Sequence, residues 1–155
     1  MPPSSWAITD WETLPWPRRI TRRRSSTLSR AVSLYPTYPE THISLGAAYR
    51  GLGKLDEAQK EYELARQLNP KDAKIYNNLA NIFFLKGDLS QALRLWHKAA
   101  DLNPFNAEAL YNLATQYERM GEQKTARAYY QRFLSVAPSR LERLKARVRA
   151  KLATP

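Results

Sequence analysis

The sequence predicts an all-α fold in which helical hairpins stack into an α-solenoid. A pattern with a period of 34 residues occurs three times between residues 39 and 138, in three successive blocks, and a fixed period of this length is the signature of repeat architectures. Within each block the apolar residues recur at helical spacing, and a glycine and a proline stand where two successive helices would end. At 155 residues the chain has room for one such stack.

Equivalent positions of the three blocks carry residues of the same kind. Leu45, Leu79 and Leu113 share one position. The other shared positions hold a small residue, an aromatic residue, a glycine, an alanine, a second aromatic residue and a proline: Gly46, Ala80 and Ala114; Tyr49, Phe83 and Tyr117; Gly53, Gly87 and Gly121; Ala58, Ala92 and Ala126; Tyr62, Trp96 and Tyr130; Pro70, Pro104 and Pro138. This pattern resembles the tetratricopeptide repeat (TPR) family over residues 39–138. The resemblance implies a right-handed solenoid of three hairpins.

The period divides the chain into units. The three blocks span residues 39–72, 73–106 and 107–138. Because one hairpin cannot bury its apolar face alone, we expect the blocks to stack and to be closed by a terminal helix. Residues 139–155 carry an apolar stripe among basic residues and predict this basic capping helix.

The region before the first block looks like a degraded repeat. Residues 25–38 match the second helix of a block, because Leu34 and Pro36 stand 34 residues before Leu68 and Pro70. No partner helix precedes it, so residues 1–24 are expected to form a flexible, basic arm that carries three tryptophans. The broken repeat leaves open the alternative that the chain is the end of a longer array.

The net charge of +11 is concentrated at the two ends. Residues 1–38 contain six arginines and two acidic residues, and residues 139–155 contain six basic residues and one acidic residue. The three blocks between them are nearly balanced in charge. An alternative function is therefore binding of nucleic acid or an anionic membrane surface through the N-terminal arm and the C-terminal helix.

The residues needed for catalysis or metal binding are scarce. The sequence contains no cysteine and two histidines, and neither histidine stands at metal-ligand spacing from another ligand. We expect His42 to pack between helices and His97 to face solvent. We therefore predict a non-enzyme with no cofactor, no metal and no small-molecule substrate. No stretch of about 18 apolar residues is present, and the lack of cysteine fits a cytoplasmic location.

In the TPR family the first helices line a concave groove that holds a peptide or helix of another protein. The resemblance therefore implies a protein partner. Asn78 and Asn112 occupy equivalent positions, with Ser44 one block earlier, and an amide can both donate to and accept from a peptide backbone. The alternative is that these asparagines belong to a solvated helix face. The other expected contact residues, among which the apolar ones would form an exposed patch, are Ile43, Asn77, Asn81, Phe84, Tyr111 and Thr115.

One specific family function is disfavoured. TPR domains that hold the C-terminal tails of chaperones use a carboxylate clamp of the pattern Lys, Asn, Asn, Lys, Arg. The matching positions of the three blocks hold one of these five residues, Asn78, and Glu108 has the wrong sign for a carboxylate ligand. The oligomeric state and the identity of the partner do not follow from the sequence.

Overall fold

The chain folds into antiparallel helices in the part that the computed structural model describes, residues 18–153, with side chains from Ser26 onward. No strand occurs within these residues. The helices, in chain order, are α2 (Arg18–Leu34), α3 (Pro39–Gly51), α4 (Leu55–Leu68), α5 (Ala73–Leu85), α6 (Leu89–Leu102), α7 (Ala107–Arg119), α8 (Gln123–Val136), the short 3-10 helix η1 (Ser139–Leu141) and α9 (Glu142–Ala153).

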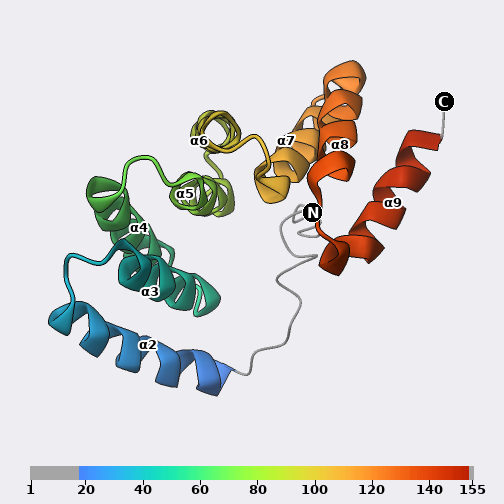
Figure 1. Cartoon of the computed structure of the whole chain (residues 1–155). Helices are drawn as coiled ribbons and strands as arrows, with labels where there is room; N and C mark the ends of the chain where they lie inside the picture. The colour runs from blue at the N-terminus through green and yellow to red at the C-terminus, as the bar shows by residue number, and fades with distance from the viewer. Residues whose placement is uncertain (1–17, 154–155) are drawn as a thin grey trace.

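The helices pair into three hairpins that follow one another along an arc. The pairs are α3 with α4, α5 with α6, and α7 with α8. Figure 1 shows α3, α5 and α7 on the inner side of the arc, with α2 at one end and α9 at the other. The expected all-α stack of three hairpins with a closing helix is therefore confirmed.

The ends of the helices follow from a few residues. Gly53, Gly87 and Gly121 have φ values of 75°, 87° and 80°, in the left-handed region that ends a helix and that glycine enters without steric cost. Asp72 opens α5 by accepting a hydrogen bond from the backbone N–H of Lys74 at 2.9 Å. Such N-caps satisfy backbone donors that would otherwise lack a partner.

The core of the interface between the first and second hairpins is apolar, and at its edge Nζ of Lys86 donates to Oδ1 of Asp56 at 2.7 Å and to Oε1 of Gln59 at 2.9 Å. The buried hydrophobic residues of this core come from α4 and α5: Ala58, Tyr62, Ala65, Ile75, Leu79 and Ile82. Tyr62 also fixes the close approach of α3 and α4, because a Cβ added to Gly46 would lie 2.7 Å from its ring. We call this cluster the apolar interface.

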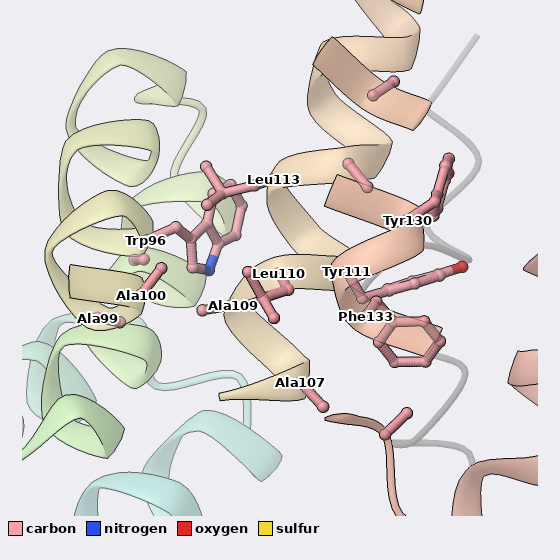
Figure 2. Packing of buried hydrophobic residues seen from close by; sticks show 14 of the residues in the cluster. Trp96, Ala99, Ala100, Ala107, Ala109, Leu110, Tyr111, Leu113, Tyr130 and Phe133 are labelled. Atoms are coloured by element: carbon pink, nitrogen blue, oxygen red, sulfur yellow. The ribbon is translucent and has the colours of Figure 1, made fainter. Parts of the chain in front are cut away.

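A larger cluster of buried hydrophobic residues runs from α5 to α9 and includes the interface between the second and third hairpins, where Trp96 is fully buried. Figure 2 shows Trp96 of α6 directed toward Leu113 of α7, and Phe133 of α8 beside Tyr111 on the other side of α7. The ring centroids of Tyr111 and Phe133 are 5.4 Å apart. Helix α7 is therefore packed on both sides.

The two ends of the stack differ from the expected boundaries in one respect. Helix α2 begins at Arg18, so it is longer than the helix expected over residues 25–38 and takes in part of the expected arm. The rest of that arm, with Trp6, Trp11 and Trp16, lies outside the described residues. At the other end, α9 packs on α8 as a closing helix, with Leu144 and Val148 buried.

Candidate functional site

The inner face, lined by α3, α5 and α7, is where the sequence places the partner-binding residues. Its exposure is uneven. Ser44 is exposed, and Ile43, Asn78 and Phe84 are half-buried. The other five expected contact residues are buried: Asn77, Asn81, Tyr111, Asn112 and Thr115. The structure thus differs from the expectation of an open surface at these five positions.

At three of these five positions, Asn77, Asn81 and Asn112, the buried side chain takes part in a hydrogen bond between α5 and α7. The Oδ1 atom of Asn81 on α5 accepts hydrogen bonds from Nε1 of Trp96 at 3.0 Å and from Nδ2 of Asn112 on α7 at 3.1 Å. An indole N–H can only donate, so Trp96 fixes the orientation of the Asn81 amide. Asn81 in turn fixes Asn112, because only the Nδ2 group of Asn112 can donate to that oxygen.

Because these two hydrogen bonds fix the orientation of the Asn112 amide, its oxygen is left without a hydrogen-bond donor. Oδ1 of Asn112 is buried and accepts no hydrogen bond. A second pair repeats the arrangement: Nδ2 of Asn77 donates to Oε2 of Glu108 at 3.2 Å, and Oδ1 of Asn77 is also buried without a donor. Leaving such a group unpaired costs on the order of 1–3 kcal/mol. We call this set of residues the polar seam: Asn77, Asn81, Trp96, Glu108, Asn112 and Gln116.

Gln116 is the member of the polar seam that the site prediction did not include. It stands 34 residues after Ile82, so it occupies the position that is apolar in the preceding block. Its side chain is 2% exposed and its Nε2 group has no acceptor. The replacement of an apolar residue by an amide at a shared position could have identified it from the sequence.

The asparagine pair expected from the sequence is therefore unequal. Asn78 is half-buried at the inner face, whereas Asn112 is buried and bonded to Asn81. The expected apolar patch is likewise partly absorbed into the core. Phe84 lies 5.7 Å from Trp96 between ring centroids, and Tyr111 packs against Phe133.

The two histidines lie in different environments. His42 is 4% exposed, as expected for a packing residue, with Nδ1 2.8 Å from Oε2 of Glu61 and Nε2 3.0 Å from the carbonyl oxygen of Pro36. His97 does not stand free in solvent as expected. It lies 2.8 Å from the hydroxyl of Tyr117 and 3.3 Å from that of Tyr129.

Helix α9 is held against the third hairpin by a charged group. Nζ of Lys151 lies 2.6 Å from Oε2 of Glu118, which also accepts a hydrogen bond from the Tyr130 hydroxyl at 2.8 Å. Partial burial by itself would raise the pKa of Glu118, but these two hydrogen bonds outweigh it and hold that pKa below its ordinary value. Burial and the same carboxylate raise the pKa of Tyr130.

Among the described residues, no group of three or more His, Cys, Asp or Glu side chains could hold a metal ion. No helix in that part of the chain is long and apolar enough to cross a membrane.

Comparison with known proteins agrees with the repeat pattern. Family models described as TPR repeat match residues 48–87 and 80–121, and a model described as tetratricopeptide repeat matches residues 108–139. These matches together span more than half of the chain. The chain therefore belongs to the tetratricopeptide repeat family.

A solved structure shows the same fold. It is titled "Crystal structure of MamA", is 20% identical in sequence, and covers 89% of this chain and 88% of that chain with a TM-score of 0.68. At this identity the likeness concerns the fold alone. No curated protein matches the sequence. TPR proteins are in general non-catalytic, so family and fold support a protein–protein interaction module.

Proposed function

We propose that this protein is a non-catalytic scaffold, adaptor or chaperone-like module that holds a segment of another protein against its inner face. The observation that carries the proposal is the polar seam, where Asn77 and Asn112 each keep a buried amide oxygen without a donor. A peptide in extended conformation supplies main-chain N–H groups, which are the donors that these oxygens lack. We propose the cytoplasm as its location, in keeping with the absence of cysteine.

The surface residues of the inner face supply the first contacts in this proposal. Ser44 and Asn78 offer polar groups, and Ile43 and Phe84 offer apolar surface at the edge of the core. The unpaired oxygens are covered by the protein's own side chains, so the partner reaches them only when docking moves those side chains aside. The N–H donors of the partner then satisfy acceptors that are unpaired in the free protein. The partner is thus selected by its backbone as well as by its side chains.

The test is selection of binders from a displayed peptide library, followed by measurement of Kd by fluorescence anisotropy. The inner-face variant is Ser44→Arg with Asn78→Ala. A matched control, Ser90→Arg with Gln131→Ala, makes the same kinds of change at exposed positions of α6 and α8. We expect the inner-face variant to weaken binding at least roughly tenfold, a loss of about 1.4 kcal/mol, and the control to leave it unchanged.

Salt provides a second readout. Binding through amides and apolar contacts should change little between roughly 0.1 and 0.5 M salt, because few phosphate or carboxylate contacts are involved. The inner face is not the binding site if the selected peptides bind the inner-face variant as tightly as they bind wild type. The same conclusion follows if the control variant on α6 and α8 loses binding instead. A selection that yields only salt-sensitive acidic peptides would contradict the proposal as well.

A further inference from the structure

The two terminal helices of the stack are both basic, but their charges are used differently. In α9, Glu142 pairs with Lys145 at 3.2 Å and with Arg149 at 2.7 Å, and Lys151 pairs with Glu118. Three of the cations of α9 are therefore paired with carboxylates, and the pair between Lys151 and Glu118 joins α9 to the third hairpin. Helix α2 contains six arginines and no acidic residue, so no ion pair within the helix can offset its charge.

Helix α2 has one face for packing and one for solvent. It packs on α3, and Leu28, Ala31 and Val32 are half-buried. Ser26, Ser29, Arg30 and Ser33 are exposed. At 3.6 residues per turn, the backbone positions of Arg19 and Arg22 fall within the arc of the helix that these exposed residues span. The backbone positions of Arg18 and Arg23 fall about 20° beyond its two edges. We call this set of arginines and serines the Arg/Ser face.

Exposed aromatic residues lie next to this face. Tyr35 directly follows α2, and its N–H donates to the carbonyl oxygen of Ala31, so the chain continues the last helical turn. Tyr35 and Tyr38 are each 59% exposed, and their rings meet edge to face with centroids 6.0 Å apart. Two tyrosines that are so exposed contribute little to the core and leave ring surface open to a ligand.

We propose that α2 and the tyrosine pair form a binding surface for single-stranded nucleic acid. Arginine and serine are side chains that contact phosphate, and the five arginine positions extend over about 18 Å of helix at a rise of 1.5 Å per residue. Proteins that bind single strands combine such a basic track with aromatic side chains on which bases stack. The surface lies at the end of the arc (Figure 1), on the helix that packs against α3, and is separate from the polar seam, whose residues lie on α5, α6 and α7.

Other anionic partners fit this surface less well. An interfacial membrane helix presents large apolar side chains toward the lipid, whereas the described residues of the Arg/Ser face are serines and one arginine. An acidic peptide would pair with the arginines but has no need of the exposed rings. The pairing of a basic helix with exposed aromatics is what favours a single-stranded nucleic acid.

The test measures anisotropy of a labelled 20-nucleotide oligothymidine with the full chain across a salt series. The first variant is Arg19→Gln, Arg23→Gln and Arg30→Gln. We expect it to lower the slope of log K against log salt by about 2, because each phosphate contact to a single strand contributes about 0.7. The matched control removes the same charge from the other end, at the exposed residues Arg140, Arg143 and Arg147, also by change to Gln. It should keep the wild-type slope.

The second variant, Tyr35→Ala with Tyr38→Ala, separates stacking from charge. It should lower affinity roughly tenfold while leaving the salt slope unchanged, because stacking is not a counterion effect. Circular dichroism checks that each variant keeps its helices. The proposal is overturned if the two arginine variants lose the same slope, if the tyrosine variant binds like wild type, or if duplex DNA, polyglutamate or phosphatidylserine vesicles compete as well as oligothymidine.

Discussion

The two interfaces between hairpins solve the same packing problem with different chemistry. The apolar interface buries Ile75, Leu79 and Ile82 of α5 against α4. The interface between the second and third hairpins contains the polar seam, with two buried amide oxygens and one amide nitrogen unpaired. Both are built on the same 34-residue pattern. The difference shows that the repeat pattern specifies how the hairpins stack. Positions outside the pattern decide whether an interface buries polar atoms that lack a hydrogen-bond partner.

The largest expected effect comes from removing the residue that belongs to both the core and the polar seam. Trp96→Ala should lower the free energy of unfolding by about 3–5 kcal/mol, because it leaves a large cavity, and it also removes the donor that orients Asn81. Urea denaturation followed by circular dichroism measures the loss. Trp96→Phe keeps most of the ring and loses the N–H, so it should cost less. Equal costs for both variants would mean that the hydrogen bond, rather than packing, dominates.

Ile82 and Gln116 occupy equivalent positions of the second and third blocks. Exchanging the two residue types between these positions tests the difference between the two interfaces directly. Ile82→Gln should destabilise the apolar interface by roughly 2–3 kcal/mol, because it buries an amide without partners. Gln116→Ile should stabilise the other interface by about 1 kcal/mol, because it removes an unpaired buried donor. Urea denaturation measures both changes in stability, from the shift of the unfolding midpoint in variants whose unfolding free energy depends on urea concentration with the same slope as in wild type. If Gln116→Ile destabilises the protein, the amide has a function in the fold that its contacts do not reveal.

A smaller effect is expected at the close approach of α3 and α4. Gly46→Ala places a Cβ 2.7 Å from the ring of Tyr62, which is fully buried. Overpacking of this kind costs roughly 1–3 kcal/mol. The control is Ser44→Ala on the same helix, where the side chain is exposed and the change should stay within about 0.5 kcal/mol. Thermal unfolding of the two variants side by side decides the point, and equal melting temperatures would contradict it.

The smallest effect concerns the closing helix. Because the pKa of Glu118 is lowered in the folded protein, the stability it contributes is present above its ordinary value of 4.5 and is lost as pH falls through the folded value. Glu118→Gln should cost about 0.2–1 kcal/mol at pH 7 for this partly exposed pair. Once the pH is below the folded pKa of Glu118, the difference from wild type should disappear. A difference that persists at that pH would show that packing, not charge, accounts for it.

The sequence was sufficient for the architecture but not for the state of the candidate site. The ends of the helices were predictable because Gly53, Gly87 and Gly121 and the shared prolines act locally on the backbone. The burial of Asn112 was not, because helical periodicity gives the face on which a residue lies and not the distance to the next helix. The orientation of its amide depends on Trp96, through Asn81, and no local pattern carries that information.

Dependence on apolar periodicity also explains which of the two terminal helices could be predicted from the sequence. The closing helix was predicted because Leu144 and Val148 lie on one stripe, and both are buried in α9. The earlier start of α2 was not predicted, because a run of arginines carries no apolar periodicity from which a boundary could be read. Arginine is nevertheless a good helix former, which accounts for a helix that begins at Arg18.

The stacking of each helix on the next along the chain has a consequence for how the molecule responds to force. Contacts between segments that are near in sequence close only short loops, so folding of the described part should be fast for its length. A stack whose units touch only their neighbours can also lengthen by small changes of angle at each interface, without loss of any hairpin. Under tension the molecule should therefore behave as a spring, and the interface that yields first should be the one in which buried hydrogen-bonding groups are still unpaired.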